Sequence, residues 1–568
     1  MAAAGTVGTP QLARAFTAAD SRTTILLNHV GFTPSASKVF LVSGTSATSF
    51  SVTSVDPVRE VFRGDLEPRG GDLGTYLLGD FSKVNEIGTF RIRLGDVRSE
   101  PFTIAPDVYL PAVRLTLDYF AKQRCGDSKT SWLGAPCHLD DGRRNDDGKR
   151  LDVTGGWHDA CDLRKWVDAT IYGMIGLSRM LELLGPQRLD ASRVIDELRW
   201  GNRYFLNMQD PAGFVMNYCG GDDGNNFTDN RAGTDDDRSI HVEPAELPGQ
   251  FHFVSAQAAV ARLTRDIDPK YADRCLQAGL RCMDWCMTKR APRAATSLAA
   301  GVIAAAQLHR TSGEGRWRDQ AADYARKLLE LQVVEAAGDG PRGFFRARPD
   351  DPEPLRDPQH GNLPLIALCE ALERFAADRD APAWERAVRT HTSLLTELAE
   401  RSAFGTVPYG LYADRNPGGG RRIGAYGYRY FMRRHGETTG DPDWWVGINA
   451  HLASNGVGLS RAARLLRDPH LSQLAQRQLD WILGLNPFDA STMSGVGRNH
   501  PGHYKTGAFK PSTPVIAGGV MNGIGGTDAD QPTLDAGSYN TCEYWTPMVS
   551  YAACLMCQQM GEIGDRAP

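Results

Sequence analysis

The chain has 568 residues, of which 41% are hydrophobic and 23% charged, and its formal net charge is −5. This composition is typical of a globular protein, and the length allows about two to four domains. We find no basic stripe and no run of about 18 apolar residues, so neither a nucleic-acid partner nor a membrane span is expected. The 11 cysteines are thinly spread, unlike those of a disulfide framework.

The N-terminus reads MAAAGTVGTPQLARAF. It lacks the basic segment and following apolar segment of a signal peptide, so the chain as it stands predicts a cytoplasmic protein. A secreted protein is predicted instead if a leader has been removed. We expect a monomer.

Short segments rich in β-branched and aromatic residues fill the first hundred residues. They recur about every 8–14 residues with Gly, Pro, Ser or Asn between them, which is typical of a small antiparallel β-sandwich. Pro106 and Pro111 interrupt this pattern, and we place the sandwich at 22–106 and a second domain at 107–563. The predicted strands lie in TTILLNHVGF, KVFLVSG, SFSVTSV, GTYLLGDF and GTFRIRLG.

Helical periodicity takes over from about residue 107, as in ATIYGMIGLSRMLELL. No short repeat recurs, which disfavours a regular solenoid. We expect about twelve helices to close into an all-α ring of six hairpins. The predicted helices are 109–123, 164–185, 190–208, 252–265, 269–288, 293–312, 315–334, 359–377, 381–401, 443–466, 469–483 and 545–561.

Four long stretches between these helices carry little periodicity: 124–163, 209–250, 402–440 and 484–544. Such loops are uncommon in a compact domain unless they are functional. We therefore expect them to gather on one rim of the ring and to carry the chemistry.

Asp159 and Asp162 lie in the segment GGWHDACD, just before the helix expected at 164–185. The positive end of a helix dipole would keep both carboxylates ionised, and a spacing of three places them roughly on one face. Capping of the helix explains one of them equally well, so the spacing leaves catalysis and capping open. The preceding Trp157 favours a catalytic site, because sugars stack on such rings.

Glu543 supplies a second kind of carboxyl group near the other end of the chain. It follows Cys542 and precedes Tyr544, and burial beside aromatic rings raises the pKa of a glutamate, as a general acid requires. The alternative is a first-turn glutamate that only favours the helix dipole.

Four segments in order resemble glycoside hydrolase family 9, the cellulase family with an (α/α)6 barrel. GGWHDACDLRKW resembles the family's segment with the paired aspartates, and YNTCEYWTPMVSYAACL resembles the segment with the catalytic glutamate. LDWILGLNPFDASTMSGVG resembles the segment between them. LNHVGFTPSASKVFLV resembles the immunoglobulin-like module that precedes the barrel in one branch of the family.

The resemblance implies an N-terminal immunoglobulin-like β-sandwich followed by an all-α (α/α)6 barrel that hydrolyses β-1,4-linked glucan with inversion. It implies that Asp162 is the general base, that Asp159 helps to hold the water, and that Glu543 is the general acid. Inversion requires about 6.5–9.5 Å between the base and acid carboxyl groups. Cys161 and Cys542 replace a glycine and an asparagine of the family pattern.

A Cys2His2 set suited to tetrahedral zinc is formed by Cys125, Cys137, His138 and His158, although the spacing is not that of a zinc finger. A disulfide or separate buried thiols are the alternatives, and Cys161 could replace one ligand. Members of the resembled branch carry a structural zinc in this loop, which favours zinc. Such an ion would fix the loop that presents the base.

The run GGDDGNNFTDNRAGTDDDRSI is rich in oxygen ligands that suit calcium, but it lacks the EF-hand spacing. A solvated acidic loop is the favoured interpretation. The candidate calcium ligands are Asp222, Asp223 and Asp229.

The segment RNHPGHYKTG replaces the family's His-His-Arg segment near the cleavage site, with His500 or His503 as possible substitutes for its histidines. The other predicted substrate contacts are Trp157, Tyr428 and Tyr544. This altered segment motivates an alternative, an exo-acting β-glucosidase or β-glucosaminidase on oligosaccharides. A non-catalytic glycan-binding protein is the remaining alternative. No organic cofactor is expected.

Overall fold

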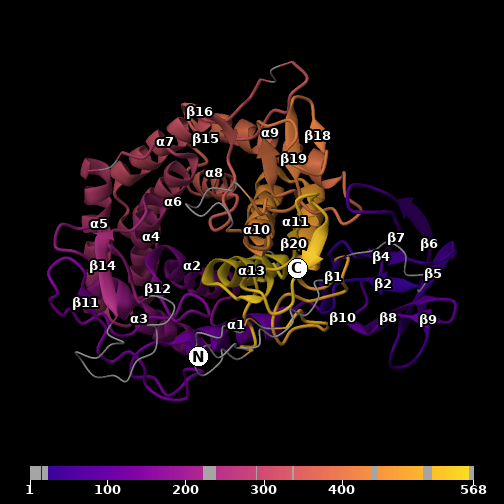
Figure 1. The fold of residues 1–568 in the computed structure, drawn as a ribbon, viewed down its shortest axis with the longest axis horizontal. Helices are drawn as coiled ribbons and strands as arrows, with labels where there is room; N and C mark the ends of the chain where they lie inside the picture. The colour runs from indigo at the N-terminus through magenta and orange to yellow at the C-terminus, as the bar shows by residue number, and fades with distance from the viewer. Residues whose placement is uncertain are drawn as a thin grey trace, which may run out of the picture.

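The computed structural model describes residues 14–15, 23–221, 238–289, 291–335, 338–435, 444–502, 504 and 515–561. Figure 1 shows a β-rich unit beside a large ring of helices. The predicted fold class, a β-sandwich followed by a helical barrel, is confirmed. The domain limits at 106 and 107 stay a prediction; the last sandwich strand ends at Ile104 and the first helix begins at Leu110.

The β-rich unit is one path of strands that folds over into two layers. The ten-residue strand β6 joins the layers, because its first half pairs with β5 and its second half pairs with β7. Phenylalanine rings fill the space between them, as where Phe40 and Phe50 meet edge to face at 4.8 Å. The strands are β2 (Thr24–Leu26), β3 (Gly31–Phe32), β4 (Val39–Ser43), β5 (Ser49–Ser54), β6 (Glu60–Arg69), β7 (Tyr76–Asp80), β8 (Gly88–Leu94), β9 (Val97–Arg98) and β10 (Phe102–Ile104).

Six helices pack side by side into a closed inner ring, in the order α2, α4, α6, α8, α10, α13 and back to α2. They are buried on almost every side, since α4 has buried residues at nearly every position from Leu247 to Ala261. This burial on all faces is what an inner wall requires. The inner helices are α2 (Val167–Leu184), α4 (Leu247–Thr264), α6 (Ala295–Ser312), α8 (Leu363–Arg374), α10 (Asn449–Leu466) and α13 (Thr546–Gln559).

Amphipathic helices cover the ring from outside, each with one buried stripe against an inner neighbour. All twelve predicted helices are present, and their ends differ from the predicted ones by a few residues. The short α12 (Tyr539–Cys542) was not predicted. The outer helices are α1 (Leu110–Gln123), α3 (Ala191–Asn207), α5 (Pro269–Lys289), α7 (Gly315–Leu329), α9 (Ala381–Ala399) and α11 (Pro469–Ile482).

The connections explain where the loops gather. Each inner helix from α2 to α10 leads to the next outer helix through a short turn, such as the one between Ser312 and Gly315. The long segments instead precede α2, α4, α8, α10 and α13, so they all lie where inner helices begin. Because the inner helices run in the same direction, these segments share one end of the barrel, as predicted for the chemistry-bearing rim.

Small sheets order parts of these long loops. The sheet nearest the acidic pair has the strand order β11–β14–β13–β12 and joins segments far apart in the sequence. Its strands are β11 (Arg143–Arg144), β12 (Lys165–Trp166), β13 (Met216–Gly220) and β14 (Ser239–Pro244). The others are β1 (Arg14–Ala15), β20 (Gly525–Gly526) and β21 (Pro532–Leu534); β15 (Arg346–Arg348) and β16 (Asp351–Pro354); and β17 (Gly410–Tyr412), β18 (Arg422–Ile423) and β19 (Tyr426–Arg429).

Polar contacts join the sandwich to the barrel. Asn28 donates to the Asp480 carboxylate at 2.9 Å, and the Tyr428 hydroxyl donates to the Asp72 carboxylate at 2.6 Å. Tyr428 is only 2% exposed, so its prediction as a substrate contact is wrong. Its ring lies where the sandwich meets β19, and its hydroxyl is used to join the two units.

No helix among the described residues is both long and apolar enough to cross a membrane.

Candidate functional site

The predicted acidic pair lies in a tight turn that leads into β12. The N–H of Asp159 donates to the carbonyl of Arg164 at 3.0 Å and closes the turn. Leu163 adopts the left-handed conformation with φ 63°, which lets the chain reverse. Asp162 therefore stands at the tip of the turn, with a side chain that is 21% exposed.

The expectation that the pair opens a helix is wrong. Helix α2 begins at Val167, because Lys165 and Trp166 extend to pair with β13. The Asp159 carboxylate instead lies buried in the turn and accepts a hydrogen bond from the N–H of Trp166 at 3.4 Å. The helix dipole is therefore not what sets its ionisation.

Burial raises the pKa of Asp159 well above its usual value, and the charges of Asp162 and Glu543 raise it further. Three carboxyl groups this close cannot all be ionised cheaply, so one of them holds a proton more readily than an isolated side chain would. Asp159 is the most buried of the three, and its surroundings favour the protonated form of its carboxyl group.

Glu543 meets the turn from the opposite end of the chain. It directly follows α12, and its carboxylate accepts a hydrogen bond from the backbone N–H of Cys161 at 3.3 Å. Thr546, at the start of α13, donates from its N–H and from its hydroxyl to the carbonyl of Asp159. The structure thus brings together three predicted catalytic residues whose roles remain proposals.

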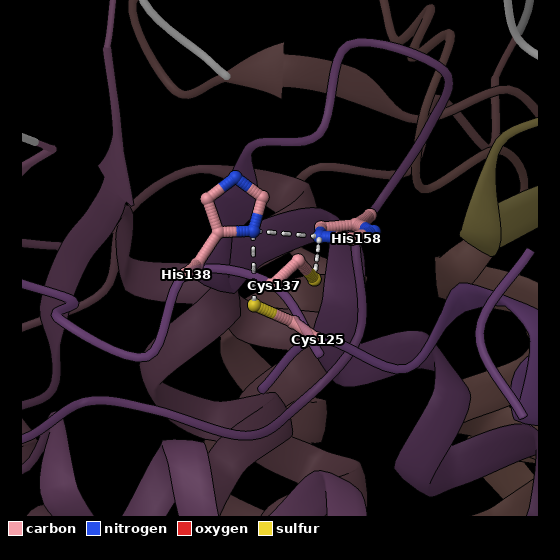
Figure 2. Close-up of side chains that lie close together, drawn as sticks. All are labelled: Cys125, Cys137, His138 and His158. Atoms are coloured by element: carbon pink, nitrogen blue, oxygen red, sulfur yellow. Dashed lines mark hydrogen bonds between the residues drawn. The ribbon is translucent and has the colours of Figure 1, made fainter. Parts of the chain in front are cut away.

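The four predicted metal ligands form one cluster, in which the ligand atoms all lie within 4.8 Å of one another and every residue is buried. Figure 2 shows His138 and His158 directed toward each other and toward the two thiols. His138 Nδ1 lies 3.6 Å from Cys125 Sγ and 3.4 Å from His158 Nε2, which lies 3.9 Å from Cys137 Sγ. Cys161 does not belong to this cluster.

These separations fit a tetrahedral zinc ion. Zinc bonds of about 2.3 Å to sulfur and 2.0–2.1 Å to nitrogen place a sulfur and a nitrogen about 3.6 Å apart and two nitrogens about 3.3 Å apart. The donor set of two thiols and two imidazoles is the set that structural zinc prefers. The residues therefore suit the ion in chemistry and in approximate geometry.

The two thiols differ in acidity in the absence of an ion. Burial opposes ionisation of Cys125, but the hydrogen bond from Cys137 and the charge of Lys165 outweigh it and hold the pKa of Cys125 well below its usual value. The hydrogen bond to Cys125 and burial raise the pKa of Cys137. None of the 11 cysteines, all within the described residues, forms a disulfide, so the disulfide alternative is wrong.

Two further predicted substrate contacts lie in the core. Trp157 is fully buried, with its ring against Phe120 and its indole N–H donating to Glu197 at 2.7 Å. Tyr544 is 2% exposed and packs edge to face on Tyr119. The predictions that these two rings stack on substrate are wrong, because both rings are buried in packing against Phe120 and Tyr119.

Of the remaining predicted substrate contacts and calcium ligands, only some lie within the residues that the structure describes. His500 is half-buried, and its Nδ1 lies 3.0 Å from the Ser491 carbonyl; its role stays a prediction. The Cys542 thiol donates to the Pro501 carbonyl at 3.6 Å, which brings this segment close to Glu543. The predictions for His503, Asp222, Asp223 and Asp229 lie outside the described residues.

Sequence reasoning missed the residues around the acidic turn. Arg164 pairs with Asp162 at 3.4 Å, and only its position two residues further on could have indicated this. A row of three half-buried rings also stands on the adjacent sheet, where Tyr218 stacks at 3.8 Å on Trp166 and at 3.9 Å on His241. These rings come from three separate strands, so no local sequence pattern reveals them.

Comparison with known proteins agrees with this architecture. The profile of glycosyl hydrolase family 9 matches residues 109–339, and that of the cellulase N-terminal ig-like domain matches residues 20–99. Glu543 lies beyond both matched ranges, so its position next to the turn is a finding of the structure.

Endoglucanase D of Acetivibrio thermocellus is 28% identical over 292 residues, which cover 46% of this chain and 44% of the relative. The chain therefore matches less than half the length of that relative. The cellodextrinase of Butyrivibrio fibrisolvens is 22% identical over 605 aligned positions, which cover 95% of this chain and 96% of that enzyme.

A zinc-binding triple mutant of the family 9 endoglucanase J30 has a similar structure, with a TM-score of 0.67, 20% identity, and coverage of 94% of this chain and 100% of that one. At this identity the likeness concerns the fold. The two profiles match in the order that the sequence predicts, so residues 109–339 are similar to glycosyl hydrolase family 9 and residues 20–99 to the ig-like domain that precedes it in cellulases.

Proposed function

We propose that this protein is an inverting glycoside hydrolase that cleaves β-1,4-linked glucan. The observation that carries the proposal is the hydrogen bond from the Cys161 N–H to the Glu543 carboxylate. It places the predicted acid against the turn that bears Asp159 and Asp162. The relatives named endoglucanase and cellodextrinase support a glucan as substrate.

The three carboxyl groups divide the reaction between them. As the water oxygen bonds to the anomeric carbon, the Asp162 carboxylate takes a proton from that water. Glu543 gives its proton to the glycosidic oxygen as the bond from that oxygen to the anomeric carbon breaks. This displacement on the opposite face inverts the anomeric centre and predicts about 6.5–9.5 Å between the two carboxyl groups, with room for one water.

Asp159 has a supporting role in this scheme. Its carboxyl group is buried beside both partners, and its raised pKa favours a protonated form that can donate a hydrogen bond to the water or to Asp162. Asp162 is more exposed than Asp159, so its carboxyl group can be ionised and act as the base.

Aromatic side chains accompany both segments that carry the carboxyl groups. The stacked rings of Trp166, Tyr218 and His241 stand on the sheet whose strand β12 begins three residues after Asp162. The rings of Tyr504 and Tyr539 lie 6.1 Å apart next to the segment with Glu543. Half-buried rings near both segments suit a pyranoside chain better than a small polar substrate.

The main alternative concerns the length of the glucan and whether it is cleaved internally or from one end. The match to an enzyme named cellodextrinase over 95% of the chain supports short glucans as the substrate. The alternative that the RNHPGHYKTG segment motivates is exo action, such as that of a β-glucosidase or β-glucosaminidase. Product analysis separates the two modes: a mixture of oligosaccharides indicates endo action, and one small sugar from the start indicates exo action.

We further propose that Cys125, Cys137, His138 and His158 hold a structural zinc ion. Bound there, the ion would tie the loop around Cys125 to the segment that leads into Asp159. The zinc-binding variant of endoglucanase J30, which shares this fold, supports the proposal. We expect no organic cofactor and a monomeric protein.

Hydrolysis of a panel of β-glucans and glucosamine oligomers tests the proposed function. We expect the wild type to cleave β-1,4-glucan and Glu543→Gln to lose nearly all activity while it folds normally. Absence of turnover on every substrate, combined with measurable binding of glucan, would instead indicate a glycan-binding protein.

A further inference from the structure

We propose that Arg164 is a positioning residue that holds the Asp162 carboxylate in the orientation and the ionised form that water activation needs. This inference rests on the proposed function, in which Asp162 is the general base. It adds a residue that none of the predicted catalytic roles includes.

Arg164 contacts Asp162 at two points. Its backbone N–H donates to Asp162 Oδ1 at 3.2 Å, and its guanidinium Nη1 lies 3.4 Å from Oδ2. One residue thus contacts both oxygens of the carboxylate. Without these contacts, the Asp162 side chain at the tip of the turn would rotate about its torsions. A displacement of its carboxylate by about 1 Å lowers the rate of proton transfer.

The arginine is itself fixed by the neighbouring strand. Its Nε donates to the Gly221 carbonyl at 3.0 Å, just beyond β13. Its aliphatic stem lies over Gly220, where an added Cβ would come within 2.9 Å of the arginine Cγ. The absence of a side chain at Gly220 therefore makes the space through which Arg164 reaches Asp162.

The charged groups near Asp162 indicate how its contact with Arg164 affects its ionisation. Among the described groups close to Asp162 are the carboxyl group of Asp159, the thiol of Cys161 and the cation of Arg164. The side chains of Arg164 and Asp162 are 23% and 21% exposed, so solvent screens the pair only in part. A cation at this distance favours the charged form of the carboxylate over the protonated one.

The pH profile of kcat/KM tests the inference. Its acidic limb reports the protonation of the base in the free enzyme. Because Arg164 favours the charged form of Asp162, Arg164→Met should move this limb to higher pH by about 0.5–1 unit. On that limb kcat/KM should fall by about 3- to 10-fold, while the activity on the plateau falls less.

Three comparisons separate this role from a merely structural one. Arg164→Lys keeps the charge and should leave the acidic limb within about 0.3 unit of the wild type. Gly220→Ala displaces the arginine stem and should move the limb in the same direction as Arg164→Met. Arg144→Met is the matched control, because Arg144 lies on β11 of the same sheet and pairs with Asp146 at 2.8 Å.

Each outcome decides the inference. If the wild type is active and Arg164→Met leaves the acidic limb in place, the inference about Arg164 is overturned, whatever the change in melting temperature. The proposed function then still stands. A shift of the same size in Arg144→Met would also overturn the inference about Arg164, because the effect would then be general. A wild type without hydrolytic activity would overturn the proposed function, and this inference with it.

Discussion

Thr546 holds the backbone of Asp159 with both of its donors. Its N–H and its hydroxyl donate to the same carbonyl oxygen, at 3.1 and 2.7 Å. Thr546 begins helix α13, three residues after Glu543. The contact therefore fixes the turn that carries the proposed base relative to the segment that carries the proposed acid.

Loss of the Thr546 hydroxyl should make the position of the acidic turn relative to Glu543 less well fixed. We expect Thr546→Val to lower kcat by about 3- to 10-fold and the free energy of unfolding by about 1 kcal/mol, because one buried hydrogen bond is lost. Steady-state kinetics and urea unfolding measure the two effects. Thr392→Val is the control, since its buried hydroxyl bonds to the Val388 carbonyl within the outer helix α9 and should affect stability only.

Replacement of each of the three carboxyl groups by an amide should lower the activity to a different extent. Asp162→Asn and Glu543→Gln should each lower kcat by at least about 10³-fold, because each removes a proton-transfer group. Asp159→Asn should retain a larger fraction, since an amide can still donate a hydrogen bond. Asp273→Asn, on the surface of α5, provides the control; equal losses in all three site variants would contradict the division of roles.

Removal of the proposed zinc ion should destabilise the loop that leads into Asp159 without changing the chemistry proposed for the carboxyl groups. We expect the purified protein to hold about one zinc per chain by mass spectrometry, and Cys137→Ser to lose it. Chelation should lower the melting temperature by at least about 5 °C. Cys282→Ser changes a buried thiol of α5 outside the cluster and should keep the zinc. A metal-free wild type with an unchanged melting temperature would refute the site.

Trp157 should act on stability and not on substrate binding. Trp157→Phe removes the hydrogen bond to Glu197 and leaves space beside Gly201, where an added Cβ would clash with the indole. We expect a loss of about 2 kcal/mol in the free energy of unfolding and a KM within about 2-fold of the wild type. A several-fold rise in KM with unchanged stability would restore Trp157 as a sugar contact.

Acid should destabilise the far end of the barrel through Glu182. Burial opposes its ionisation, but Arg179, Arg262 and Arg310 lower its pKa from 4.5 to about 2. A lowered pKa in the folded state stabilises the fold above the pKa of the unfolded chain, and this contribution is lost as pH falls from about 5 to about 2. It amounts to about 3 kcal/mol.

Unfolding measured from pH 7 to pH 3 checks this effect. The difference in stability between the wild type and Glu182→Gln should be largest at neutral pH and should shrink as the pH falls. Glu385→Gln, in an exposed ion pair with Arg389, should show little difference at any pH. A difference for Glu182→Gln that does not change with pH would show that its charge is not responsible.

The helices and most sandwich strands could be predicted because local periodicity reports which face of an element is buried. Strand β6 was missed, since Glu60–Arg69 is mostly charged or exposed and contains Pro68. Its pairing is dictated by β5 and β7 on either side. The start of α2 was misplaced for the same reason, because pairing with β13 draws Lys165 and Trp166 into a strand.

The sequence by itself determined the residue types of the candidate site: the paired aspartates, the distant glutamate and the four candidate metal ligands, each beside a local motif. Only the tertiary structure decided which rings are buried, that Trp157, Tyr428 and Tyr544 serve packing, and that Arg164 and Thr546 hold the acidic turn. The physical reason is that a motif records local chemistry, whereas burial and partnership depend on segments hundreds of residues away that the closed ring of helices brings together.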